Sequence, residues 1–173
     1  MTSSQNLASP SHSAQKPSQA SIQASIQGLI DAHKSIPGAL LPLLHAIQDH
    51  LGYIPPAAVG DIAKGLNLSR AEVHGVITYY HFFRSEAPGQ HVVQVCRAEA
   101  CQACGAEELM ALAEKTLGCA SHSTTVSGSV TLEPVYCLGM CASSPAIQVD
   151  DKMHARVTPH KLTQLLRQLE ASA

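Results

Sequence analysis

Residues 95–105 read VCRAEACQACG and residues 135–145 read VYCLGMCASSP, and together they hold five of the six cysteines of this 173-residue chain. The elements around these two stretches decide the fold. HVVQV, at residues 91–95, predicts a strand that leads directly into Cys96. A second strand, which ends at Cys137, follows a linker that begins at residue 127. The pattern of residues 103–118, between the two strands, predicts a helix that ends at Gly118.

The order of these elements predicts where the cysteines meet. Two strands joined by one helix pair in parallel through a right-handed crossover, so their C-terminal ends lie at the same edge of the sheet. Open α/β sheets bind their ligands at such an edge. We therefore expect Cys96 and Cys101, on one loop, to face Cys137 and Cys141, on the other.

The rest of the C-terminal half completes an α+β fold. Residues 146–157 alternate around Asp150 and Asp151 and predict a hairpin, and residues 158–170 predict a closing helix with Thr158 as its cap and Pro159 as its first residue. Strand, helix, strand, hairpin and helix in this order indicate a thioredoxin-like α/β domain over residues 89–173.

The N-terminal half reads as helical. Residues 1–20 are rich in Ser and Gln and predict a disordered tail. Residues 21–88 predict a bundle of three or four helices, in which Ser69 and Glu72 have the spacing of a capping box. Residues 59–80 also resemble a helix-turn-helix, but the second helix offers one Arg, Arg70, and no cluster of Asn, Gln or Lys to meet base edges. Two packed helices of a bundle are therefore the better interpretation.

Composition excludes several classes of function. Eleven basic and thirteen acidic residues give a net charge of −2 without clustering, which argues against a nucleic-acid partner. No run reaches the roughly 18 apolar residues of a membrane span. The first 20 residues lack an apolar centre and contain no Arg, so we expect neither a secretory signal nor a transit peptide, and a cytoplasmic location. In that reducing compartment, closely spaced cysteines are more often metal or redox groups than disulfides.

The spacing of the cysteines allows two assignments of metal ligands. Cys96 and Cys101 with Cys137 and Cys141 give a C-x4-C and a C-x3-C pair, suited to two irons or one zinc. Cys96, Cys101 and Cys104 with Cys137 match the plant-type ferredoxin spacing instead. We favour the first set, because the second leaves Cys141 without a role and because Cys104 enters the helical pattern. Cys119 is isolated, which indicates a structural role.

Two further classes of function compete with an iron–sulfur protein. Structural zinc sites prefer C-x2-C pairs, and the wider loops here leave room for peptide N–H groups to point at sulfur, so a zinc-stabilised binding module is less favoured. A thioredoxin-like thiol oxidoreductase would use Cys101 and Cys104 as its redox pair, and this would leave Cys137 and Cys141 without a function.

Four segments of the chain are similar to a known family. They are GALLPLLHAIQDHLGYIP, VITYYHFF, VCRAEACQACGAEEL and LEPVYCLGMCASSPAIQVDD. From about Ile30 to the C-terminus, the chain resembles the thioredoxin-like [2Fe-2S] ferredoxins, which include the E subunit of NADH-quinone oxidoreductase and the matching subunits of soluble hydrogenases and formate dehydrogenases. The family's ligand pattern falls on Cys96, Cys101, Cys137 and Cys141. CRAEACQA and LEPVYCLGMCA look most like the gamma subunit of NAD-dependent, molybdenum-containing formate dehydrogenase.

The resemblance implies an electron-transfer subunit that holds one [2Fe-2S] cluster. The chain contains neither G-x-G-x-x-G nor G-x-x-x-x-G-K-[ST], so hydride chemistry is expected on partners. The resemblance implies that these are a flavin subunit binding FMN and NAD, and a large iron–sulfur subunit with a molybdenum cofactor that oxidises formate. The helical bundle is then the expected docking face. The E subunit of respiratory NADH-quinone oxidoreductase and its counterpart in a soluble NAD-reducing hydrogenase are the alternatives within the family.

Overall fold

The computed structural model describes residues 18–172 of the chain. The chain divides into two compact units, and the second begins at Glu86. Most of the predicted tail lies outside the described residues. Its last two positions belong to helix α1 (Gln19–His33), whose N-cap Ser18 accepts a hydrogen bond from the N–H of Ser21.

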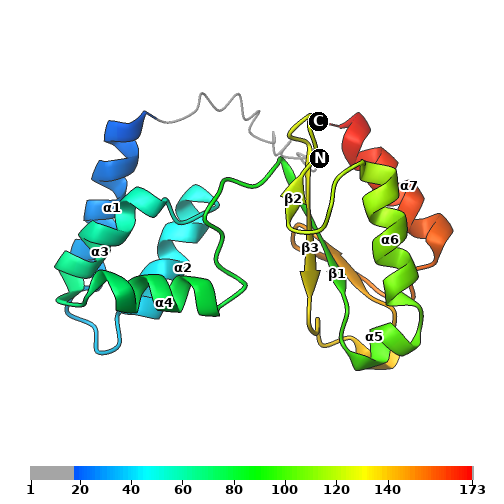
Figure 1. Cartoon of the computed structure of the whole chain (residues 1–173), viewed down its shortest axis with the longest axis horizontal. Coiled ribbons are helices and arrows are strands. Elements are labelled where there is room, and N and C mark those ends of the chain that lie inside the picture. Colours follow the sequence, from blue (N-terminus) through cyan, green and yellow to red (C-terminus); the bar gives the residue numbers. More distant parts are fainter. Residues whose placement is uncertain (1–17, 173) are drawn as a thin grey trace, which may run out of the picture. The chain divides into compact units, whose positions relative to one another are not determined.

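The first unit is a bundle of helices, as its sequence pattern predicts (Figure 1). The predicted capping box forms at the start of α4: the Ser69 hydroxyl accepts from the Glu72 N–H, and the Glu72 carboxylate accepts from the Ser69 N–H. After α1 the elements are α2 (Leu40–Leu51), the short 3-10 helix η1 (Pro56–Ala58), α3 (Val59–Leu66) and α4 (Arg70–Tyr79).

The helices enclose an aliphatic core and one buried amide. Gln48 is 4% exposed, and its Nε2 donates to the carbonyl of Phe82 at 2.8 Å while its Oε1 accepts from the N–H of Arg84 at 2.7 Å. This side chain therefore fastens the segment after α4 to α2. The fully buried core residues include Ile26, Ile30, Leu43, Leu44, Ile47, Ile54, Ile62 and Val73.

The second unit is built on a mixed sheet in the order β2-β3-β1-β4-β5. The predicted parallel pairing is confirmed, and the register places Cys96 opposite Val135. The predicted hairpin around Asp150 and Asp151 is confirmed as an antiparallel pair. The strands are β1 (His91–Cys96), β2 (Ser123–Thr124), β3 (Val130–Val135), β4 (Ile147–Val149) and β5 (Lys152–His154).

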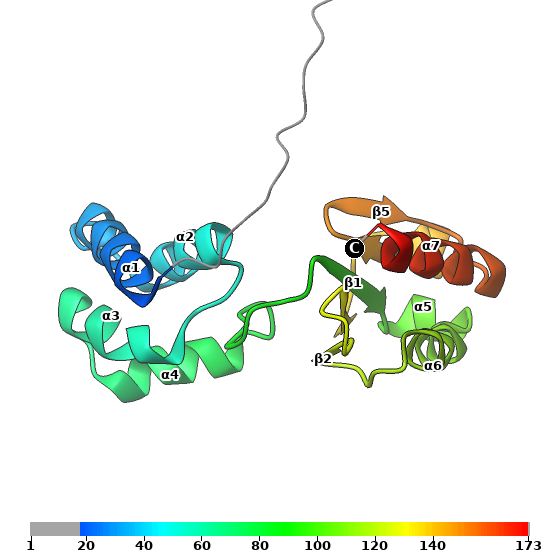
Figure 2. The same cartoon turned by 90° about the horizontal axis from the view of Figure 1, so that it is seen from above.

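Two helices cover one side of this sheet (Figure 2). They are α6 (Ala106–Leu117) and α7 (Pro159–Ala171), and α7 has the predicted cap, Thr158. Side chains of β1 alternate accordingly: Val93 and Val95 are buried in the core that the helices share, whereas Gln94, between them in sequence, is half-buried. In β3, Leu132 is buried in the same core and the next residue, Glu133, is half-buried. The observed architecture is the expected α+β fold.

The structure corrects the prediction for the segment between β1 and β3. The helix expected over residues 103–118 begins only at Ala106, because Gly105 takes a left-handed conformation with φ +88°. Cys101, expected on a loop, lies instead in a separate short helix, α5 (Glu99–Ala103), and Cys104 caps its C-terminal end. Within residues 18–172, no helix combines the length and the apolar character needed to cross a membrane.

Candidate metal centre

The four cysteines singled out by the sequence lie at the C-terminal edge of β1 and β3. Cys96 is the last residue of β1, and Cys137 follows β3 by two residues. Cys101 lies in α5, which contacts the short 3-10 helix η2 (Cys141–Ser143). The parallel crossover therefore brings both cysteine segments to one edge, as expected.

The sulfur atoms form an inner and an outer pair. Cys96 and Cys101 are each 2% exposed, and each thiol influences the pKa of the other. The Sγ atoms of Cys137 and Cys141 lie 3.8 Å apart, and both residues are exposed. In residues 18–172, no three His, Cys, Asp or Glu side chains are gathered as for a single metal ion. Two pairs of thiolates suit a cluster of two irons, in which each iron takes two protein ligands.

Backbone N–H groups point at three of the sulfur atoms. The backbone N–H groups of Ala98 and Leu138 favour the thiolate form of Cys96, and that of Ala146 favours the thiolate form of Cys101. The N–H of Gly139 donates to Cys137 Sγ at 3.3 Å. Such donors stabilise a thiolate and the negative charge of an iron–sulfur cluster.

The pKa values of the thiols follow from burial and from these contacts. Burial raises the pKa of Cys96. Burial also opposes ionisation of Cys101, but hydrogen bonds from Ser144, Cys96 and the Ala146 N–H together lower its pKa. The pKa of Cys141 is raised, first by its hydrogen bond with Cys137 and then by the charge of that neighbour. Bound iron would supply the positive charge that allows adjacent thiolates to coexist.

The loop after β3 has an unusual backbone that presents the outer pair. Cys137 has φ +122°, which an L-residue rarely adopts, and Gly139 has φ +76°. The turn at Gly139 brings its own N–H back onto the Cys137 sulfur. Residues held in such conformations often belong to functional sites.

The remaining two cysteines lie apart from these pairs. Cys104 is exposed at the end of α5. Cys119 is half-buried against the core of the second unit, and burial raises the pKa of its thiol. The expected structural role of Cys119 agrees with this packing.

Sequence reasoning missed the polar side chains that support the cysteine segments. Ser144 Oγ lies 3.5 Å from Cys101 Sγ, and Arg97 forms a two-point ion pair with Glu107. Residues 143–145, SSP, follow Cys141 closely, and this run was the sequence signal for the contact of Ser144 with Cys101. Nothing in the linear pattern pairs Arg97 with Glu107, which lies ten positions later, beyond helix α5 and in the first turn of α6.

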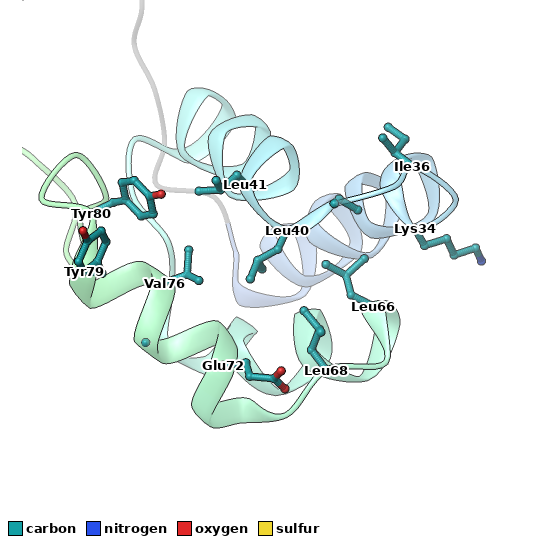
Figure 3. Close-up of a pocket in the computed structure, with 13 residues that line it drawn as sticks. Lys34, Ile36, Leu40, Leu41, Leu66, Leu68, Glu72, Val76, Tyr79 and Tyr80 are labelled. Atoms are coloured by element: carbon teal, nitrogen blue, oxygen red, sulfur yellow. The ribbon is translucent and has the colours of Figure 1, made fainter.

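The first unit carries a groove of about 820 Å³ on its surface. Figure 3 shows Leu40, Leu66, Leu68 and Val76 around it, with Tyr79 and Tyr80 at one end and Lys34 and Ile36 at the other. Ile36, Tyr79 and Tyr80 are 44%, 75% and 42% exposed. Large apolar side chains left exposed together are typical of binding surfaces.

Residues 26–170 match the model of one protein family, described as thioredoxin-like [2Fe-2S] ferredoxin. The chain belongs to this family. The predicted family is thereby confirmed, and so is its cofactor: the chain is a [2Fe-2S] protein. The inner and outer thiol pairs and the N–H groups directed at them fit such a cluster.

Relatives in the family are subunits of NADH-quinone oxidoreductases. The E 2 subunit of NADH-quinone oxidoreductase from Rhizobium meliloti is 34% identical over 78% of this chain and 80% of its own length. NADH-quinone oxidoreductase subunit 2 of Thermus thermophilus is 35% identical over 77% of this chain and 74% of its own. The E subunit of the Escherichia coli NADH-quinone oxidoreductase is 33% identical over 74% and 77%.

A solved structure shares the fold. The crystal structure of an NAD⁺-reducing [NiFe]-hydrogenase in the H₂-reduced state superposes with a TM-score of 0.65 at 17% identity, over 78% of this chain. Our chain spans only 22% of that hydrogenase chain. The comparison therefore shows the fold alone.

Proposed function

We propose that this chain is the [2Fe-2S] electron-transfer subunit of a cytoplasmic NAD-dependent formate dehydrogenase complex, in which it exchanges single electrons with a flavin subunit. The observation that supports the electron-transfer part is the presence of two thiol pairs at one sheet edge, one buried and one exposed. The formate dehydrogenase part rests on the loop sequences CRAEACQA and LEPVYCLGMCA.

Cys96, Cys101, Cys137 and Cys141 are the proposed cluster ligands. The contact between Cys101 Sγ and Ser144 Oγ, at 3.5 Å, joins the two cysteine segments. A [2Fe-2S] cluster, when bound, supplies one-electron redox chemistry and no substrate site. The work of this chain is to hold the four thiolates and to shield one pair from water.

The exposed pair defines the face through which electrons would pass. Cys137 and Cys141 lie at the surface, and the neighbouring Tyr136 is 66% exposed. A partner's redox group has its shortest path to the cluster from this side. The flavin subunit, with FMN and NAD, is therefore proposed to dock here as well as on the helical unit.

The groove of the first unit is the proposed docking surface on that unit. Its aliphatic floor and the exposed ring of Tyr79 have the composition of an interface core, in which aromatic residues are enriched. The chain has six aromatic residues of the Phe and Tyr types, and four of them lie within residues 79–83. This concentration favours a protein partner over a purely structural bundle.

A second candidate is the role that the relatives carry. The chain would then be the E subunit of an NADH-quinone oxidoreductase, which the identities of 33–35% favour. The third candidate is the counterpart of this subunit in a soluble NAD-reducing hydrogenase. All three assign the same electron-transfer task and differ in the complex.

Isolation of the native complex tests the choice. The chain is tagged in its own host, purified under mild conditions, and its partners are identified by mass spectrometry. We expect a flavin subunit and a large molybdenum- and iron–sulfur-containing subunit, together with formate-dependent reduction of NAD⁺. Co-purification of membrane-bound quinone oxidoreductase subunits instead would assign the chain to the respiratory enzyme.

A further inference from the structure

A carboxylate outside the cysteine set joins the two parts of the chain that carry the inner thiol pair. Glu107, in the first turn of α6, accepts from Arg97 Nε at 2.9 Å and from Arg97 Nη2 at 2.5 Å. The same carboxylate accepts from Gln102 Nε2 at 3.5 Å. Arg97 directly follows Cys96, and Gln102 directly follows Cys101.

The helix that carries Cys101 needs such support. Helix α5 has five residues, and its N-cap Ala98 provides no side-chain hydrogen bond. Isolated helices this short do not hold themselves together in water, so contacts outside the helix must fix it. Its own last turn ends at Cys104, and Gly105 then redirects the chain into α6.

The ion pair between Arg97 and Glu107 fixes the chain just before α5. The N–H of Arg97 donates to the carbonyl of Val135 at 2.7 Å, which fixes its backbone to β3. Its side chain turns toward α6, where Glu107 meets the fork of the guanidinium with both oxygens. A two-point pair of this kind fixes direction as well as distance.

We infer that Glu107 is a positioning residue for the iron–sulfur site: its carboxylate ties the chain after Cys96 to the helix that carries Cys101, and so sets the separation of these two sulfur atoms. The inference rests on the proposed ligand assignment. Groups behind metal ligands typically change metal affinity by about 10–100-fold when they are removed.

The ion pair also gives the two partners opposite electrostatic effects. Reduction adds negative charge to a cluster, so a nearby positive charge favours the reduced form and a negative charge disfavours it. Removal of the Glu107 charge leaves Arg97 unpaired beside Cys96, whereas removal of Arg97 leaves the carboxylate unpaired. A role in folding alone would not give this change of sign.

The test compares three full-length variants: Glu107→Gln, Arg97→Gln and Glu108→Gln. Glu108 is the matched control, because it is an exposed carboxylate in the same turn of α6. Two quantities are measured on each iron-loaded protein: the rate at which a chelator bleaches the visible spectrum, and the reduction potential. Circular dichroism checks that each variant is folded.

We expect Glu107→Gln and Arg97→Gln to lose iron about tenfold faster than wild type, and Glu108→Gln to lose it at the wild-type rate. The potential should rise in Glu107→Gln and fall in Arg97→Gln. Equal rates of iron loss in Glu107→Gln and Glu108→Gln would overturn the inference. Cys101→Ser, measured in parallel, tests the ligand assignment separately from the role of Glu107. A wild-type cluster in that variant would overturn the ligand assignment itself.

Discussion

The Sγ atoms of Cys137 and Cys141 lie 3.8 Å apart at the surface of the second unit, whereas Cys96 and Cys101, at the same edge of the sheet, are each 2% exposed. The N–H of Gly139, between the outer two, donates to Cys137. The outer pair therefore has its geometry set by a turn of five residues, and the inner pair by the end of a strand and a separate helix.

The ligand assignment predicts the effect of single substitutions. Replacement of Cys96, Cys101, Cys137 or Cys141 by Ser should abolish or strongly change the visible absorption of the cluster, because each removes one of four ligands. Cys104→Ser, the control from the exposed end of α5, should keep the wild-type spectrum. Loss of iron in Cys104→Ser with retention in Cys141→Ser would favour the plant-type set.

The second unit should fold and bind its cluster without the first. A fragment of residues 86–173 contains the sheet, α5, α6, α7 and all four proposed ligands. We expect two irons and two sulfides per fragment by chemical analysis.

The stability of this fragment should depend on the residue at which it begins. The N–H of Gly89 donates to Thr131 Oγ1 at 2.7 Å, and a Cβ at this glycine would lie 2.8 Å from the carbonyl oxygen of Gly128. Residue 89 is thus fitted closely against the turn before β3. A fragment of residues 90–173 should be less stable than one of residues 86–173, and equal stability in urea would contradict this account.

The first unit has a close helix contact that makes a sensitive test of its core. A Cβ built on Gly65, in α3, would overlap Cγ2 of the buried Ile30, in α1. Gly65→Ala should lower the free energy of unfolding of this unit by about 1–3 kcal/mol, measured by far-ultraviolet circular dichroism in urea. Visible absorption at low urea should stay that of wild type, because all four proposed ligands lie in the other unit.

Gly60→Ala is the matched control for this substitution. Gly60 lies in the same helix, and a Cβ there meets no atom within 4 Å. Alanine should leave stability unchanged or raise it by up to about 1 kcal/mol, because glycine has more freedom to lose on folding. A destabilisation equal to that of Gly65→Ala would contradict the packing argument.

The proposed docking groove predicts a loss of binding without a loss of cluster. Tyr79→Ser removes a ring that is 75% exposed and should weaken binding to the flavin subunit about tenfold or more, as expected for an aromatic hot spot. Isothermal titration with the purified flavin subunit measures the effect. Val126→Ser, at an exposed apolar residue of the second unit, is the control, and equal affinities of the two variants would argue against the groove.

The sequence predicted the parts of the fold that rest on strong local patterns. The capping box at Ser69, the cap at Thr158 and the hairpin at Asp150 each have a signal within a few residues, and each is present. The parallel pairing of β1 and β3 followed from one general rule about crossovers. That rule was enough to predict that the two cysteine segments lie at the same edge of the sheet.

What the sequence did not predict depends on short elements and distant pairs. Helix α5 has five residues and β2 has two, so neither has room for a periodic pattern. The sequence pattern placed Gly105 inside one helix over residues 103–118, whereas its left-handed conformation separates α5 from α6. The pairing of Arg97 with Glu107 depends on that break, and was therefore missed with it.

The most direct test of the proposed function is electron paramagnetic resonance of the cluster after addition of physiological reductants. A [2Fe-2S] centre exchanges one electron, whereas NADH and formate deliver hydride, so a flavin or molybdenum centre must act between them. The isolated chain with NADH should stay oxidised and silent. Addition of the flavin subunit should give the signal of a reduced two-iron centre with NADH, and formate should give it only with the molybdenum subunit present. Rapid reduction of the isolated chain by NADH, or no reduction by NADH with the flavin subunit bound although dithionite reduces the cluster, would contradict the account.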